Sequence, residues 1–586
     1  MKKYQRFSPY EQEGGYSRAS KVLRDAQGSR LVIQDFRPLP GSIEWELGLS
    51  AYEQYGSLAF AGDQPIPFAI NNDGNLSLDA AEVLFHTLQQ ADENGSLEPE
   101  ILVLELGPGL GLFARYLMDV FRELCRKLDK DYYNRLTYVA GDRSEKMLAD
   151  IGRRGVFANH VGHYELRVVD ALRPEQYFGT HPEWKDSRFH AIFLNYVLDS
   201  LPATALRVSS QGVKQLCVRT CLARGVKLCE YTDLSTDELA RLANSDDPAL
   251  KRRLADLFDF FASEYAYRDV EVADLPHGEF AVEFARHQKC SHLLHSYGAL
   301  ESLERLLPLL HPDGFILVND YGSAEAKDYD KGFEHQRFGE AVAVGLNFAL
   351  LEEYFRQRGG WQCVAPPEDN GHIYSRMIGM RLLPTVVDRF QRRFTKSQFD
   401  CKREPASAAS ACIQAGRFEA AAVAYREALQ RQPYNWLLMS ETAKFLMFTL
   451  RDSDAGLEMA RAALALNPCS AELWNTLGDG LFLVDRFDEA RRAFQRALEL
   501  DPEDVRARYN LSFLFEHNRD YASALRMIAD ALALDKRGAY RDGLQRKQDE
   551  ILQKLASKFQ QHGQRMANRV TDLTRPEYVP KLEPSK

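Results

Sequence analysis

An aliphatic run that leads directly into a glycine turn restricts the fold of this chain more than any other feature. Ile101–Leu106 are almost all apolar, which is typical of a strand buried on both faces of a parallel sheet. Gly107, Gly109 and Gly111 follow, and glycine permits a tight turn and a close approach of the backbone to a ligand. Apolar residues then recur at helical spacing over Leu110–Leu128. This pattern predicts a nucleotide-type site at the carboxyl end of a parallel strand.

The turn differs from the fingerprint of dinucleotide-binding proteins. That fingerprint requires G-x-G-x-x-G, and Leu112 stands where the third glycine should be. Glu105 lies two residues before the first glycine. The resulting E-x-G-x-G-x-G pattern is similar to motif I of class I methyltransferases that use S-adenosylmethionine.

Four further predicted strands end in a polar side chain. They are Leu136–Asp142, Leu166–Asp170, Phe189–Asn195 and Gly314–Asp320. The carboxyl ends of parallel strands meet at one edge of a sheet, so these four tips are expected to surround one crevice. A carboxylate at Asp142 can accept hydrogen bonds from both ribose hydroxyls, and Asn195 would lie beside the methyl donor. Each residue alone could instead form a turn or cap a helix.

Motifs in chain order give a closer resemblance, which covers roughly residues 50–385. The chain resembles the MidA-type methyltransferases, which include a mitochondrial complex I assembly factor. The segments that carry this resemblance are Glu105–Gly109 (E-x-G-P-G), Asn195–Pro202 (N-E-x-x-D-A-L-P), Asp320–Gly322 (D-Y-G) and Gly345–Phe348 (V-D-F). Gly62-Asp63 is similar to a G-D pair near the start of that family.

The resemblance implies an α/β, Rossmann-like class I fold with a seven-stranded, mostly parallel sheet, whose last strand is antiparallel near Ile373–Leu382. It implies S-adenosyl-L-methionine as cofactor. The cofactor-binding residues would be Glu105, Gly107, Gly109, Gly111, Asp142, Asp170 and Asn195, with Asp170 near the adenine amino group. The catalytic candidates on the acceptor side would be Asp199, Asp320, Tyr196 and Tyr321.

The implied activity is arginine N-methylation of a protein, and one residue departs from it. The family has an acid after the asparagine of its second motif, where this chain has Tyr196. A carboxylate would hold a guanidinium by paired, charge-assisted hydrogen bonds, which tyrosine does less well. Asp199 or Asp320 could substitute, although Asp199 could also cap a helix that begins at Leu201.

An insertion at about residues 223–300 separates the fourth and fifth strands. It is rich in charged helix formers, so we interpret it as a helical lid over the crevice, with a peripheral helical pair as the alternative. His287, Cys290, His292 and His295 lie close together in it. Metal ligands on a helix must share one face, which this spacing does not allow, so we expect no metal site.

The last third of the chain shows a repeat. Pro433, Pro468 and Pro502 are 34–35 residues apart, which is the tetratricopeptide period. The clearest unit begins at Ala471 and has the residue types of the repeat at Trp474, Leu477, Gly478, Ala490, Phe494 and Ala497. Stacked repeats form an all-α solenoid with a concave surface, so we expect its groove to hold a protein partner or substrate. A brace within the chain or a dimer contact is the alternative.

The division into domains follows from these features. We predict an N-terminal accessory segment (1–95), a methyltransferase domain (96–395), tetratricopeptide repeats (400–535), and a capping helix to about Gln561 with a loose tail (536–586). A net charge of −10 argues against a general nucleic-acid binder, and no apolar run is long enough to span a membrane. Nine scattered cysteines indicate reduced thiols and a cytoplasmic protein.

Three functions remain open at this point. The first is a protein methyltransferase whose repeats recruit the substrate. The second is a small-molecule methyltransferase whose repeats serve assembly. The third is a non-catalytic assembly factor or scaffold that retains the fold. The methyl acceptor, its reacting atom and the oligomeric state are not specified by these patterns.

Overall fold

The computed structural model describes residues 31–60, 74–178, 188–222, 228–230, 232–331, 336–338, 341–369, 373–535 and 540–573. Gly62-Asp63 and the last thirteen residues, 574–586, lie outside these ranges. Contacts divide the chain into two units. The first comprises residues 1–445 and 462–469, and the second comprises residues 446–461 and 470–586.

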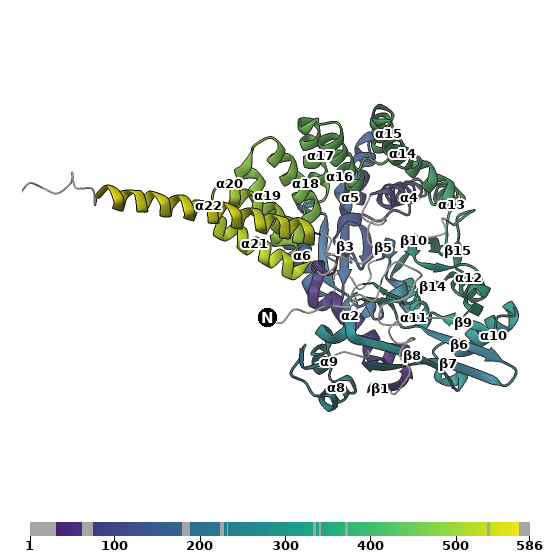
Figure 1. Ribbon diagram of the computed structural model, residues 1–586. Coiled ribbons are helices and arrows are strands. Elements are labelled where there is room, and N and C mark those ends of the chain that lie inside the picture. Colours follow the sequence, from purple (N-terminus) through teal and green to yellow (C-terminus); the bar gives the residue numbers. More distant parts are fainter. Residues whose placement is uncertain are drawn as a thin grey trace, which may run out of the picture. The chain divides into compact units, whose positions relative to one another are not determined.

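The first unit is built on a seven-stranded sheet (Figure 1). From one edge to the other its strands are β15 (Gln362–Val364), β16 (Tyr374–Gly379), β10 (Leu310–Asp320), β5 (Phe189–Asn195), β2 (Ile101–Leu106), β3 (Leu136–Asp142) and β4 (Tyr164–Val168). The five from β10 to β4 are parallel, and β16 runs antiparallel to both of its neighbours. The glycine turn therefore follows a strand in the middle of the sheet.

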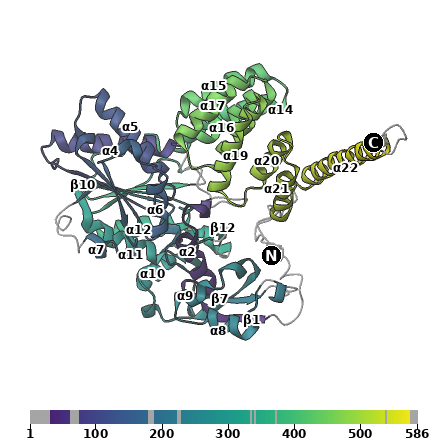
Figure 2. The ribbon, with the colours of Figure 1, turned by 90° about the vertical axis from the view of Figure 1, so that its left-hand side faces the viewer.

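Helices cover both faces of this sheet (Figure 2). One face packs against α4 (Asn75–Glu93) and α5 (Leu112–Lys127), where the rings of Phe113 and Phe193 are 5.3 Å apart. The other face packs against α7 (Pro174–Phe178), α11 (Tyr297–Leu306) and α12 (Phe348–Arg358) in one continuous apolar core. Both faces of β2 are buried, in agreement with its unbroken aliphatic sequence.

A second sheet lies below the main sheet in Figure 1. Its strands are β1 (Leu31–Pro38), β7 (Gly212–Leu222), β6 (Thr204–Ser209), β9 (His292–His295) and β8 (Phe261–Asp269), which pairs with β7. The helices α8 (Thr236–Ala243), α9 (Pro248–Arg252) and α10 (Gly278–Gln288) complete this region. Two strands of the insertion, β8 and β9, thus belong to the same sheet as the N-terminal strand β1.

The prediction of a purely helical insertion is wrong for two of its segments. Phe261, Tyr265 and Tyr267 recur at even spacing, which is a strand period, and β8 pairs with β7 along its whole length. His292 and His295 lie on β9, because α10 ends at Gln288 and the chain turns there. Aromatic side chains are buried in helices and in strands alike. Only their spacing along the sequence therefore distinguishes a strand from a helix here.

Helix α2 (Ile43–Tyr55) joins the two sheets. Trp45 and Leu47 are buried in the core of the second sheet. The carboxyl end of α2 and the following 3-10 helix η2 (Gly56–Phe60) contact α6 (Glu145–Arg153), which follows β3 of the main sheet. The N-terminal segment is therefore part of the core of the first unit, and it reaches the edge where β3 ends.

The first helical pair of the repeat region also belongs to the first unit. Helices α13 (Pro384–Arg393), α14 (Lys396–Gln414), α15 (Phe418–Arg431) and α16 (Trp436–Lys444) follow the main sheet. Lys402 on α14 pairs with Asp79 on α4 at 2.6 Å. The side-chain amide of Asn75 donates to the Gln432 side chain at 3.0 Å. These polar contacts hold the pair α14–α15 against α4.

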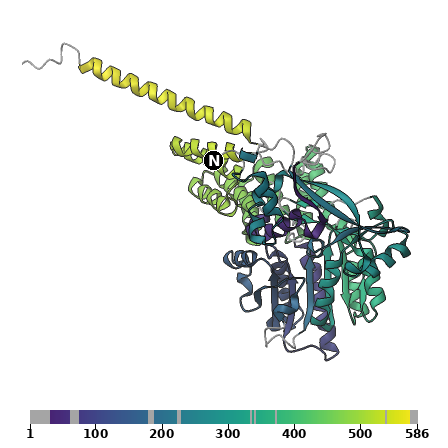
Figure 3. The same ribbon diagram turned by 90° about the horizontal axis from the view of Figure 1, so that it is seen from below.

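The second unit is entirely helical in its described residues. It contains α18 (Ala471–Leu483), α19 (Phe487–Leu500), α20 (Val505–His517), α21 (Tyr521–Leu534) and α22 (Arg541–Leu573), while α17 (Ser453–Leu466) spans the division. A Cβ on Gly478 would collide with the Phe494 ring, so glycine lets α18 and α19 approach closely. The predicted capping helix is longer than expected: α22 continues past Gln561 to Leu573, beyond the helices it packs on (Figure 3).

Candidate active site

The glycine turn has a backbone that only glycine adopts easily. Gly107, Gly109 and Gly111 have φ angles of +66°, +54° and +77°, in the left-handed region. The N–H of Gly107 donates to the Gly141 carbonyl at 2.8 Å, which ties the turn to β3. A Cβ on Gly107 would also lie 2.7 Å from a methyl carbon of Val197. The conformation therefore favours glycine at all three positions, and close packing also requires it at Gly107.

A buried chain of hydrogen bonds lies beneath this turn. The Glu105 carboxyl accepts from the Tyr138 hydroxyl at 3.0 Å and from the Asn195 amide at 3.5 Å. Asn319 donates to the Asn195 carbonyl oxygen at 2.8 Å, and Ser375 donates to Asn319 at 2.7 Å. One side chain from each of five adjacent strands takes part. Burial raises the pKa of Glu105 to about 8, although both of its donors favour the carboxylate.

This chain of hydrogen bonds changes the interpretation of two predicted cofactor ligands. Glu105 is 1% exposed, Asn195 is 4% exposed, and the polar atoms of both are engaged inside the protein. Their observed contacts support the strands below the glycine turn. Contact of either side chain with a ligand stays a prediction.

Asp142 is the last residue of β3, and Asp170 comes two residues after the neighbouring strand β4, so both acids lie at strand tips as predicted. Asp142 Oδ1 accepts from the Ser144 N–H at 2.7 Å, and Asp170 Oδ1 accepts from the Leu172 N–H at 2.8 Å. Such turns use one carboxylate oxygen, and a carboxylate has further sites for ligand hydroxyls. Burial raises the pKa of Asp142 to about 6, although the hydrogen bond from the Ser144 N–H lowers it. Asp142 is therefore mostly ionised at neutral pH.

Asp199 and Asp320 form a buried carboxyl pair. Asp320 Oδ2 accepts from the N–H groups of Leu198 and Asp199 at 2.9 and 3.1 Å, and its Oδ1 accepts from the N–H of Tyr321 at 2.8 Å. A side-chain hydrogen bond joins the two carboxyls. Burial raises the pKa of Asp199 to about 7. Burial and the charge of Asp199 raise the pKa of Asp320. Three backbone donors to Asp320 oppose this rise, and the pair shares a proton near neutral pH.

The alternative role of Asp199 as a helix cap is wrong. Leu198–Ser200 form a short 3-10 turn, and β6 begins at Thr204, so no helix starts at Leu201. The Asp320 carboxylate orders this turn through the two N–H groups from which it accepts. Proline at position 202 fits the extended chain that leads into the strand.

Tyr196 and Tyr321 are brought together beside this carboxyl pair. Their rings are stacked, with centroids 4.8 Å apart and planes 15° apart. Tyr196 has a φ of +56°, which a non-glycine residue rarely adopts, and its N–H donates to the Asn319 carbonyl at 2.9 Å. Strain of this kind is often found at functional sites, where the surroundings enforce it. The four catalytic candidates therefore lie together at the tips of β5 and β10.

Sequence patterns did not point to Tyr52 and Phe60, which also reach this edge. The Ser144 hydroxyl donates to the Tyr52 carbonyl at 2.9 Å, next to Asp142. The rings of Tyr52 and Phe60 are 6.3 Å apart, and Phe60 lies 3.4 Å from where a Cβ on Gly109 would be. Both residues belong to α2 and η2, far from any strand tip in the sequence. No motif spacing identified them.

The histidine cluster shows no features of a metal site. In the described ranges, no three His, Cys, Asp or Glu side chains are placed to hold a metal ion together. His295 is buried and its Nε2 contacts the Pro276 carbonyl, and burial lowers its pKa to about 4. Among the same residues, no helix is both long and apolar enough to span a bilayer. No two cysteines of these ranges form a disulfide bond.

Known proteins resemble separate parts of this chain. The peroxisomal targeting signal receptors of Eremothecium gossypii and Saccharomyces cerevisiae are 37% and 43% identical over 89 and 67 residues. These stretches are 15% and 11% of this chain and 16% and 11% of the receptors, so the chain spans about a sixth or less of these relatives. A solved protein from Burkholderia thailandensis bound to S-adenosyl-homocysteine is 16% identical, with a TM-score of 0.36 over 56% of this chain and 75% of its own.

Family models match two regions. Residues 81–359 match a family described as "Putative S-adenosyl-L-methionine-dependent methyltransferase". Residues 471–504 and 493–526 match two models of the tetratricopeptide repeat. The predicted order of a methyltransferase region followed by repeats is thus confirmed. The chain therefore combines a region that matches this S-adenosyl-L-methionine-dependent methyltransferase family with tetratricopeptide repeats C-terminal to it.

Proposed function

We propose that this chain is a class I methyltransferase that transfers the methyl group of S-adenosyl-L-methionine to a protein bound by its repeats. One observation carries the proposal: the glycine turn, Asp142, Asp170 and the Asp199–Asp320 pair lie at the carboxyl ends of the five parallel strands of one sheet. Ligands of open α/β sheets bind at this edge. The position of antiparallel β16 between β10 and β15 also supports a class I fold.

The residues at this edge fit the cofactor. The glycines of the turn at Gly107–Gly111 have no side chains that would keep a ligand from the backbone, and α5 begins directly after it with its amide dipoles directed at the turn. Asp142 is mostly ionised at neutral pH and can accept both ribose hydroxyls. Asp170, after the neighbouring strand, would accept from the adenine amino group. The bound cofactor supplies an activated methyl group on a sulfonium ion.

The residues around Asp199 suit a methyl acceptor whose nitrogen loses a proton when it is methylated. A group with a pKa near neutrality serves best as a proton acceptor, and burial raises the pKa of Asp199 to about 7. An arginine side chain is the acceptor that we favour. Its planar guanidinium can stack on the ring of Tyr196, which stands where the family has an acid, and it can pair with the Asp199 carboxylate. Orientation for an in-line transfer supplies the remaining rate acceleration.

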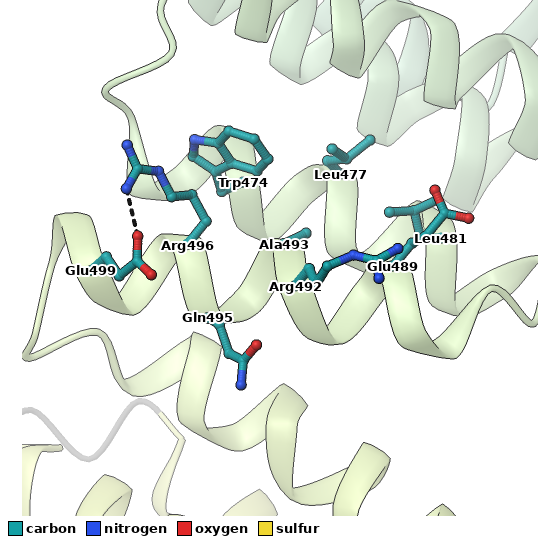
Figure 4. A pocket seen from close by; sticks show the side chains of 9 residues that line it. All are labelled: Trp474, Leu477, Leu481, Glu489, Arg492, Ala493, Gln495, Arg496 and Glu499. Atoms are coloured by element: carbon teal, nitrogen blue, oxygen red, sulfur yellow. Dashed lines mark hydrogen bonds and ion pairs between the residues drawn. The ribbon is translucent and has the colours of Figure 1, made fainter. Parts of the chain in front are cut away.

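The repeats offer a place for the protein substrate. A cavity of about 440 Å³ lies between α18 and α19 (Figure 4). Trp474, Leu477 and Leu481 form its apolar wall, and Trp474 is only partly buried, so it is not purely a core residue. Arg492 and Arg496 form the opposite rim, where Arg496 hydrogen-bonds to Glu499. An extended segment with an apolar anchor would fit this cavity.

Transfer of a labelled methyl group tests the proposal. With tritiated S-adenosylmethionine and a cell lysate, the full chain is expected to label protein, and mass spectrometry should find an addition of about 14 daltons on arginine. Asp199→Asn is expected to reduce labelling by about 100-fold, since it removes the proton acceptor. Trp474→Ala should reduce labelling of the protein substrate without changing cofactor affinity.

Two other outcomes would contradict parts of this account. Label found only in small molecules after protein removal would favour a metabolite methyltransferase. Asp199→Asn with unchanged activity would exclude Asp199 as the proton acceptor.

A further inference from the structure

The N-terminal segment formed by α2 and η2 lies outside the matched family region, which begins at residue 81. It nevertheless contacts α6, the helix that follows Asp142. A segment that precedes the matched region and contacts the helix after Asp142 can bring further side chains to the proposed donor site.

Polar contacts fasten the segment to the loop after β3 and to α6. Arg143 pairs with Glu53 at 2.6 Å, and the Ser144 hydroxyl donates to the Tyr52 carbonyl at 2.9 Å. The hydroxyl and the N–H of Ser57 both donate to Asp150 Oδ2, at 2.6 and 3.1 Å. Asp150 is 4% exposed, so this contact is shielded from water. The segment is thus fixed to the residues that adjoin Asp142.

Gly56 allows the chain to turn between the two elements. Its φ is +56°, and a Cβ there would lie 2.9 Å from Asp150 Oδ2. The turn redirects the chain so that η2 returns toward the glycine turn. Phe60 then lies 3.4 Å from the position of a Cβ on Gly109. Its ring is 6.3 Å from that of Tyr52, so the two rings stand next to each other.

Tyr52 lies near two acids of the proposed site, Asp142 and Asp199. Burial, and then the negative charges of Asp199 and Asp142, raise the pKa of its phenol. The phenol therefore stays neutral at physiological pH and can donate a hydrogen bond. Tyr52 is close enough to Asp142 on the donor side and Asp199 on the acceptor side to interact electrostatically with both.

We propose that Tyr52 and Phe60 form an aromatic wall of the S-adenosylmethionine site, contributed by the N-terminal segment and facing the glycine turn. This inference rests on the proposed function. Aromatic faces bind cations, and a sulfonium carries a positive charge that the product, S-adenosylhomocysteine, lacks. The wall should therefore favour the charged donor over the neutral product, and it should close over the ligand.

Calorimetric titration of the full chain with each ligand tests the wall. Tyr52→Leu and Phe60→Leu are each expected to weaken S-adenosylmethionine binding at least about 10-fold, and to weaken S-adenosylhomocysteine binding less. Tyr52→Phe retains the ring and should bind the donor nearly as tightly as the wild type. Phe36→Leu is the matched control, because Phe36 is a half-buried ring on β1 that contacts Arg219 and Arg268, and it should have no effect.

The outcomes separate this inference from the proposed function. If the wild-type chain binds neither ligand, the proposed function is wrong. If the wild-type chain binds and both leucine variants bind equally well, only the wall is wrong. Hydrogen exchange of the wild-type chain gives a second measurement that needs no variant: the amides of residues 52–60 should exchange more slowly when S-adenosylmethionine is added. Unchanged exchange there would also overturn the wall.

Discussion

Replacing Asp320 by alanine is expected to reduce methyl transfer at least about 100-fold, because the turn that carries Asp199 would no longer be held in position. The Asp320 carboxylate accepts from three backbone N–H groups, those of Leu198, Asp199 and Tyr321. In the variant these buried donors would lose their acceptor, at a cost of roughly 1–3 kcal/mol each. Urea unfolding should therefore show a loss of several kcal/mol in the free energy of unfolding.

Asp320→Asn separates the structural part of this effect from the electrostatic part. Asparagine keeps one acceptor oxygen and nearly the same shape, so the fold should largely survive. Its amide can still donate a hydrogen bond to the Asp199 carboxylate, so the pKa of Asp199, which burial raises, should stay near 7. The pH–rate profile of the wild type should rise with a midpoint near this value as Asp199 loses its proton. The midpoint should be nearly the same in Asp320→Asn.

The carboxyl pair also predicts how stability depends on pH. Both folded-state pKa values are raised above the usual value of 3.8, so the folded chain binds more protons than the unfolded chain between about pH 4 and 7. The contribution of the pair to stability is therefore largest at low pH and falls as pH rises through this window. An Asp320→Ala variant with wild-type stability and wild-type activity would contradict this description of the pair.

Substitutions of Glu105 should have opposite effects on stability, depending on which side chain replaces it. Glu105→Ala leaves the Tyr138 hydroxyl and the Asn195 amide without their acceptor and opens a cavity inside the sheet. We expect it to lower the free energy of unfolding by about 3–5 kcal/mol. The cofactor site should be lost with it, because the glycine turn rests on this chain of hydrogen bonds.

Glu105→Gln should be tolerated and should stabilise the chain at alkaline pH. Burial raises the pKa of Glu105 to about 8, so the carboxyl is mostly protonated at neutral pH, and glutamine mimics that form. Its oxygen can accept from Asn195, and its NH₂ can donate to the Tyr138 oxygen. The raised pKa makes the wild type less stable as pH increases from about 4.5 to 8, by about 1.4 kcal/mol per unit of pKa shift.

A comparison of unfolding curves at two pH values checks this prediction. At pH 8 the glutamine variant should exceed the wild type by on the order of 2–4 kcal/mol, and at pH 5 the two should be similar. Glu264 provides the control, because it is a partly exposed acid on β8 that pairs with Arg219, and Glu264→Gln should show no gain at pH 8. A Glu105→Gln variant that is less stable than wild type at both pH values would show that Glu105 is ionised when folded.

Parallel strands were the part of the fold that local sequence patterns predicted best. Each combines an apolar run with a polar residue at or just after its end, and both signals are local. β2, β3 and β5 begin and end at the expected residues, while β4 ends at Val168, two residues earlier than expected. The acids at the tips then come together because parallel strands share their carboxyl edge.

Features that depend on distant parts of the chain were not predictable in this way. β8 becomes a strand because β7, which ends almost 40 residues earlier, is available to pair with it. Tyr52 and Phe60 reach the site because Gly56 turns the chain and Asp150 holds Ser57. Asp320 was recognised as an acid at a strand tip, but its burial and its three backbone donors depend on the turn after β5.

The central claim is that the edge formed by the glycine turn and Asp142 binds the adenosyl group, and the affinity for S-adenosylhomocysteine tests it most directly. Isothermal titration of the full chain at about pH 7.5 should show one site, and Asp142→Ala should weaken binding at least about 10-fold. Asp269→Ala changes an exposed acid on β8 and should leave the affinity for S-adenosylhomocysteine unchanged. Wild-type affinity should also fall about 10-fold for each pH unit below 6, where Asp142 gains a proton. A wild-type chain that shows no binding, or an Asp142→Ala variant that binds as tightly as the wild type, would contradict the account.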